Sequence, residues 1–179
     1  YGPQITNVQI LDLDGDTFQD ILACDAQENA LYWYRQNPLG TWKEHRIAGN
    51  LEIPAHATVL DIDQDGDHDI IVSILGDIMP SDQHIGSIIL LENRDGQYHR
   101  RTLLDEVRRV ADVQGADFDS DGDIDLALSS LVDGKTRVYE NLSGSLDTTP
   151  DWQASDEFQA STTVAWADVN GDGDLELAI

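Results

Sequence analysis

Short apolar runs recur along the chain, each directly after a cluster of acidic residues. They occupy residues 21–23, 70–72, 126–128 and 177–179. An apolar run of this length after a turn is typical of a buried strand. Strand-compatible residues also precede each acidic cluster, at 8–11, 58–60, 115–116 and 164–167. Each acidic cluster is therefore predicted to join the two strands of a β-hairpin.

The acidic clusters place oxygen-bearing side chains at positions 1, 3, 5 and 9 of a nine-residue loop. The four sets are Asp12, Asp14, Asp16, Asp20; Asp61, Asp63, Asp65, Asp69; Asp117, Asp119, Asp121, Asp125; and Asp168, Asn170, Asp172, Glu176. The backbone carbonyl at position 7 is expected to add a ligand, from Phe18, Asp67, Asp123 and Asp174. A cation that takes roughly six to eight oxygens fits such a loop, which predicts bound Ca²⁺.

Two other interpretations explain these loops less well. Solvated Asp-Gly turns are common, but they do not account for four copies with one ligand spacing. An EF-hand loop needs a bidentate glutamate at position 12. Position 12 is instead occupied by side chains that cannot bind a metal, namely Ala23, Val72, Leu128 and Ile179.

The loops mark a long repeat. They begin at residues 12, 61, 117 and 168, about 50 residues apart, a period typical of propeller blades. A turn of the form N-x-x-G recurs in phase at 37–40, 93–96 and 141–144. These patterns predict an all-β protein, a β-propeller of four-stranded antiparallel blades within a single segment, 1–179. The predicted blades are approximately 5–50, 51–106, 107–160 and an incomplete 161–179, which further blades of the same polypeptide are expected to complete.

The segments DVNGDGDLELAI and DFDSDGDIDLALSS resemble the FG-GAP and VCBS repeats. Those repeats build calcium-binding β-propellers of the integrin α-chain type and of many bacterial surface proteins. The resemblance covers essentially the whole chain, and it implies an extracellular or cell-surface location. One loop departs from the pattern, because Thr17 stands where the other loops have Gly66, Gly122 and Gly173. A β-branched residue is unfavourable where φ is positive, so lower occupancy is expected there.

Composition narrows the choice of partner. The formal net charge is −25, and 18 of the 35 acidic side chains lie inside the four loops. The acidity therefore belongs mainly to the predicted metal sites. It argues against nucleic acid, whose binding proteins carry basic patches, and against anionic membrane surfaces. No apolar stretch approaches the length of a transmembrane helix, so no membrane insertion is expected. The single cysteine, Cys24, is expected to be a small core residue.

No catalytic motif stands out, and no catalytic residue is assigned. The longest connection, residues 76–84, is predicted on the face opposite the cation loops, where binding residues commonly occur. Ordinary loop residues are the simpler interpretation of that face, but it supplies a set of candidate partner contacts: His56, Asp77, His84, Arg108 and Arg109.

Two functional classes remain open. The first is an extracellular binding or adhesion module for a protein or glycan ligand, in which calcium is structural. The alternative is a polysaccharide lyase or hydrolase on a propeller scaffold, which would draw on His56, His84, Arg108 and Arg109.

Overall fold

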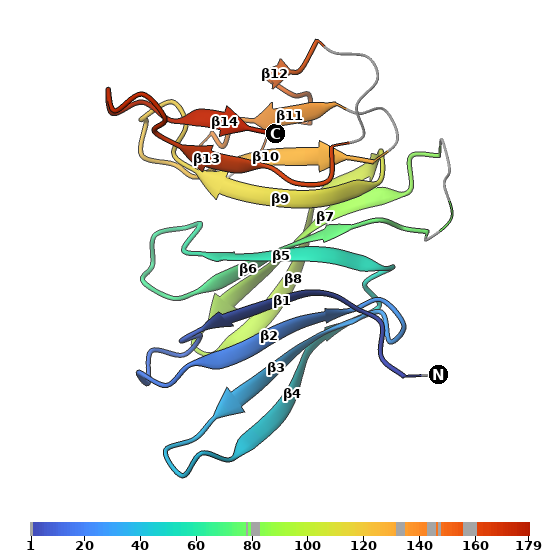
Figure 1. Ribbon diagram of the computed structural model, residues 1–179, viewed down its shortest axis with the longest axis vertical. Helices are drawn as coiled ribbons and strands as arrows, with labels where there is room; N and C mark the ends of the chain where they lie inside the picture. The colour runs from blue at the N-terminus through green and yellow to red at the C-terminus, as the bar shows by residue number, and fades with distance from the viewer. Residues whose placement is uncertain are drawn as a thin grey trace.

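The computed structural model describes residues 2–77, 79, 83–131, 135–142, 146, 148–155 and 161–179. Over these residues the chain forms three four-stranded antiparallel sheets and one two-stranded sheet (Figure 1). The predicted fold class is thus confirmed. The sheets follow one another in chain order and resemble propeller blades, but they do not close into a ring over the described residues.

Within each sheet, neighbouring strands are consecutive in the chain. The first sheet contains β1 (Ile5–Leu11), β2 (Asp20–Asp25), β3 (Ala30–Gln36) and β4 (Trp42–Gly49). The second contains β5 (Pro54–Leu60), β6 (Asp69–Ile74), β7 (Gly86–Arg94) and β8 (Gln97–Val107). The third contains β9 (Val110–Ala116), β10 (Asp125–Ser130), β11 (Thr136–Tyr139) and β12 (Trp152–Gln153). The last consists of β13 (Ala165–Ala167) and β14 (Glu176–Ala178).

The first two strands of every sheet form a hairpin around an acidic loop, as predicted. In each hairpin the residue before loop position 1 pairs with position 9. The pairs are Leu11 with Asp20, Leu60 with Asp69, Ala116 with Asp125, and Ala167 with Glu176. The hairpin loops lie along one side of the molecule, and the end of β6 and the start of β7 lie on the other (Figure 1).

The core lies between successive sheets. Every residue of β6 and of β10 is buried, because the apolar runs after the loops are covered on both faces. Cys24 is fully buried in the cluster between the first two sheets, and burial raises the pKa of its thiol to about 12. Among the described residues there is no helix long and apolar enough to cross a membrane.

The outer strands of the first two sheets carry exposed charged side chains. β4 and β8 are largely exposed and rich in charged side chains, which discourages pairing with another sheet edge. In the third sheet the sequence predicts an outer strand over 151–158. The structure has β12 at residues 152–153, and residues 156–158 lie outside the described part of the chain.

Candidate metal centres

Two reversals of the backbone shape each loop. Position 6 has a positive φ in all four loops: 74° at Thr17, 95° at Gly66, 98° at Gly122 and 98° at Gly173. Position 4 is also left-handed, at Gly15, Gln64, Ser120 and Gly171. The local fold is therefore the same in every repeat, whichever residue stands at these two positions.

In three loops this fold brings carboxylates from positions 1, 3 and 9 together. Their ligand atoms lie within 4.8 Å of one another in each group: Asp12, Asp14 and Asp20; Asp61, Asp63 and Asp69; Asp117, Asp119 and Asp125. Three like charges at this spacing repel one another unless a cation lies between them. These groups can hold a metal ion such as Ca²⁺, which accepts carboxylate oxygens in flexible geometry.

The third loop offers one observation that fits a bound cation. Oδ1 of Asp117 is buried and has no hydrogen-bond partner among the described residues. A buried carboxylate oxygen is normally paired. A cation bound by the carboxylates of Asp117, Asp119 and Asp125 would supply the missing partner.

Backbone amides hold the loop carboxylates in place. At position 1, Asp61 accepts hydrogen bonds from the amides of Asp65 and Gly66, both at 3.0 Å. Position 5 accepts from the amide of position 7 in every loop, at Asp16, Asp65, Asp121 and Asp172. The position-5 carboxylates lie outside the 4.8 Å groups. Metal binding by them, and by the carbonyls of Phe18, Asp67, Asp123 and Asp174, stays a prediction.

The position-9 aspartates also connect strands, a role that the ligand pattern alone did not indicate. Asp69 is fully buried; its Oδ2 accepts the amide of Ile62 at 3.0 Å and its Oδ1 the amide of Asn93 at 2.7 Å. Asp20 and Asp125 make the same pair of contacts, with Leu13 and Gln36 and with Phe118 and Asn141. Burial raises the pKa of Asp69 and Asp125, and the amide hydrogen bonds oppose that rise.

The hydrogen bond from the end of the third strand to position 9 also changes which residues of the three N-x-x-G turns are structurally equivalent. Asn93 and Asn141 begin their N-x-x-G turns, but the equivalent residue of the first sheet is Gln36, one position before Asn37. Residues 143–144 of the third turn lie outside the described part of the chain.

Comparison with known sequence families agrees with this geometry. The pattern of the FG-GAP-like repeat matches residues 12–72 and 117–179, more than half of the chain. The chain belongs to the FG-GAP-like repeat family. Each matched region starts at position 1 of a loop and extends into the second strand of the next sheet. No curated protein matches the chain.

The first FG-GAP-like loop differs from its neighbours in charge. Nη2 of Arg35 lies 2.6 Å from Oδ2 of Asp14 and 3.1 Å from Oδ2 of Asp16. Arg35 immediately precedes Gln36, and the equivalent residues of the next two repeats are Glu92 and Glu140. A guanidinium at this point competes with a bound cation, whereas a carboxylate favours one. This charge pattern predicts a lower cation affinity for the first loop than for the second and third.

The fourth FG-GAP-like loop keeps backbone hydrogen bonds to positions 1 and 9 of the kind that the other loops make, but it does not bring three carboxylates together. Nδ2 of Asn170 donates to Oε1 of Glu176 at 2.8 Å, and the amide of Val169 donates to Oε2 at 2.7 Å. Asp168 accepts the amides of Gly171 and Gly173. No triad of the kind seen in the other loops forms here among the described residues. The ligand set Asp168, Asn170, Asp172 and Glu176 stays a prediction.

A calcium titration is expected to fill the second and third loops first. Thr17 at φ 74° costs about 1–2 kcal/mol in the first loop, because its Cβ crowds the backbone there. Thr17→Gly should therefore raise the stability of the calcium-loaded protein by about 1 kcal/mol. Calorimetric titration measures the order in which the loops bind calcium, and thermal melting measures the gain in stability of Thr17→Gly.

The matched control is the reverse change in the second loop, Gly66→Thr. No atom lies within 4 Å of the Cβ that this change would add, so only backbone strain should lower stability. The interpretation fails if the first loop fills before the other two, or if both substitutions leave the melting temperature unchanged.

The structure brings four of the candidate partner contacts together in two pairs, Asp77 with Arg109 and His84 with Arg108, and places His56 elsewhere. Arg109 is 5% exposed, and its Nη2 donates to the carbonyl of Asp77 at 2.7 Å. His56 lies between two sheets, whereas His84 is exposed and Arg108 is half-buried. Residues 78 and 80–82 of the predicted long connection lie outside the described part of the chain.

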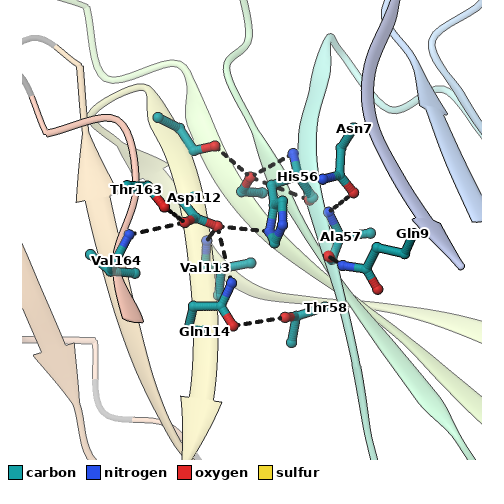
Figure 2. Close-up of polar contacts among 12 residues, drawn as sticks. Asn7, Gln9, His56, Ala57, Thr58, Asp112, Val113, Gln114, Thr163 and Val164 are labelled. Atoms are coloured by element: carbon teal, nitrogen blue, oxygen red, sulfur yellow. Dashed lines mark hydrogen bonds and ion pairs between the residues drawn. The ribbon is translucent and has the colours of Figure 1, made fainter. Parts of the chain in front are cut away.

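A chain of polar contacts joins the innermost strands of neighbouring sheets (Figure 2). Its members stand five residues before each loop: Asn7, His56, Asp112 and Thr163. Nδ1 of His56 lies 2.7 Å from Oδ1 of Asp112, and Oδ2 of Asp112 accepts the Thr163 hydroxyl at 2.8 Å. Asn7 accepts the amide of Ala57 at 3.4 Å. We call these four residues the inner-strand polar chain.

Asp112 is the centre of this chain. It is 4% exposed and also accepts the amides of Val113 at 2.8 Å and Val164 at 3.0 Å. Burial acts to raise its pKa, but the contact with His56 and the hydrogen bonds from Val164 and Thr163 together hold the pKa below its usual value. The recurrence of polar residues at this point of each repeat was the sequence signal that could have revealed the chain.

Proposed function

We propose that the protein is a calcium-stabilised β-propeller segment that acts as a binding or adhesion module for a protein or glycan ligand. The observation that carries this proposal is the trio of aspartate groups, each built into a hairpin that starts a blade. Backbone amides orient their carboxylates. A bound Ca²⁺ would neutralise the loop carboxylates and fix the hairpin.

The position of the aspartates supports a structural role for the cation. One ligand of each group, at position 9, is buried and bonded to the end of the third strand. A cation held there would stiffen three strands of the blade together. Loops on the opposite side would then be presented on a rigid scaffold, which is a common arrangement for binding sites.

An extracellular or cell-surface location is part of the proposal. Extracellular calcium modules commonly bind with dissociation constants of about 10⁻⁴ to 10⁻³ M, so such sites fill only where calcium is plentiful. Further blades of the same polypeptide would complete the ring. Nucleic acid is not expected as a partner of a chain with a net charge of −25.

The enzymatic alternative, a polysaccharide lyase or hydrolase, is less well supported. Of the four residues available for it, Arg109 is buried against the carbonyl of Asp77 and His56 contacts Asp112. His84 and Arg108 remain near the surface. The geometry therefore favours binding without cleavage.

An assay that follows both binding and cleavage tests the proposal. The calcium-loaded protein would be incubated with a panel of polysaccharides and with cell-surface proteins, and bound material and new chain ends would be measured together. Capture of a ligand that stays intact and is released by chelator supports the module. New reducing or unsaturated ends that require the protein would establish the enzyme instead.

A further inference from the structure

A cleft of about 180 Å³ lies between the second and third sheets. The second sheet and the connections next to it contribute His84, Glu106 and Arg108 to its wall, and the third sheet contributes Ser130, Arg137 and Tyr139. At about 30 Å³ per water, the cleft has room for roughly six waters, or for one small organic group. Ser130 ends β10, which starts at the third cation loop. The cleft therefore lies at the end of β10 that is remote from that loop.

Ser130 is the first sign of a ligand. It is 3% exposed, and its buried Oγ has no hydrogen-bond partner among the described residues. Buried hydroxyls are normally paired. Ser130 alternates along β10 with Ser129, which pairs with Thr136 on β11. By this alternation Ser130 shares the side of Leu128, whose side chain packs in the core between the second and third sheets.

Charge is the second sign. The chain has only ten lysines and arginines against 35 acidic residues, yet Arg108 and Arg137 both line this one cleft. The planar guanidinium matches a carboxylate with two parallel hydrogen bonds. His84 adds a third group that is able to donate. The cleft thus places two guanidinium groups near a buried hydroxyl, a setting that suits one oxyanion.

Glu106 limits the choice of anion. Its carboxylate can accept hydrogen bonds from hydroxyl groups, but it repels a second negative charge nearby. A doubly charged phosphate or a run of acidic side chains fits this wall poorly. A group with one carboxylate and several neighbouring hydroxyls offers a complementary partner to Arg137, Ser130 and Glu106 together.

We infer that this cleft binds a sugar acid, a single saccharide unit that carries one carboxylate. The inference rests on the proposed ligand-binding function and deepens it, because it names the ligand class and the residues. The carboxylate would meet Arg108 and Arg137. The hydroxyls would meet Ser130 and Glu106.

The test uses the calcium-loaded chain titrated with sodium glucuronate, followed by the amide resonances of residues around the cleft. Neutral glucose and sodium sulfate serve as comparison ligands. Glucuronate is expected to shift the resonances of Arg108 and Ser130, at concentrations at least tenfold below those that glucose or sulfate require. Arg137→Gln should weaken glucuronate binding at least tenfold, and Lys43→Gln on exposed β4 removes the same charge and should change nothing.

Ser130→Ala separates a binding role from a structural one. It should weaken glucuronate binding several-fold and leave the ligand-free melting temperature unchanged or higher, because a hydroxyl without a partner is removed. A fall in melting temperature with unchanged binding would contradict the inference.

Other outcomes would also overturn it. Equal responses to sulfate and glucuronate would indicate a general anion site, and equal responses to glucose would remove the role of charge. A response to a glutamate-containing tripeptide, but not to glucuronate, would assign the cleft to an acidic protein side chain. In each case the calcium-dependent melt and ligand capture can persist, so the proposed function would survive the loss of this inference.

Discussion

Removal of calcium is expected to lower the melting temperature by roughly 15 to 30 °C. A ligand that binds only the native state, at 100 times its dissociation constant, stabilises by about 2.7 kcal/mol per site. Three aspartate groups are positioned to bind, which gives about 8 kcal/mol. For a chain of this size each kcal/mol moves the midpoint by about 2–4 °C. Thermal melts in calcium and in chelator measure the difference.

Single substitutions make this test specific to the loops. Asp63→Asn removes one carboxylate from the second triad and should reduce the calcium-dependent shift by about one third. Asp95→Asn removes the same charge from an exposed turn residue at φ 55°, which asparagine tolerates, and should leave the shift intact. If the protein melts at the same temperature with and without calcium, structural calcium is excluded.

Asp112→Ala is expected to destabilise the protein by about 3–5 kcal/mol, within the range for removing one partner of a buried charged network. The change would leave the Val164 amide and the Thr163 hydroxyl without their acceptor, and would remove the contact with His56. Denaturant unfolding at saturating calcium measures the loss. The calcium affinity of the loops should stay the same, since Asp112 lies outside every triad.

The matched variant is Asp112→Asn, because the first sheet carries Asn7 at the equivalent point. It keeps an acceptor oxygen and should cost less than Asp112→Ala. The folded state lowers the pKa of Asp112 below its reference value of 3.8. The carboxylate therefore contributes its full stability above about pH 4, and the contribution is lost as the pH falls through the lower folded value. The difference in unfolding free energy between wild type and Asp112→Asn should narrow only under those acidic conditions.

Much of the fold follows from local patterns. The acidic loops and the apolar runs after them lie next to each other in the sequence, so the hairpins could be predicted from neighbouring residues. The third strands were marked by their N-x-x-G turns. The alignment failed by one residue at Gln36, because the contact that defines it reaches from Asp20 across two strands.

The candidate sites were likewise predictable only where the interacting residues are close together in the sequence. The triads of the first three loops were predictable, since their ligands lie within nine consecutive residues. The fourth loop looked similar, but the Asn170 amide donates to Glu176. Arg35 and Asp112 were missed because their partners come from other strands or other sheets. The cleft at Ser130 was not predicted, because it forms where two blades pack together and the sequence pattern does not indicate how they pack.

The repeats share one loop pattern, but each has a different residue in the inner-strand polar chain. Any of the first three hairpins can gather an aspartate triad, but the neighbours at the axis differ from one junction to the next: an amide, a histidine, an aspartate and a hydroxyl. If the second and third repeats exchanged places, the metal loops would be preserved. Asp112 would then stand beside Asn7, and His56 beside Thr163. The contacts between neighbouring sheets thus depend on one polar residue per repeat that differs from repeat to repeat, whereas the loops that build each blade are alike.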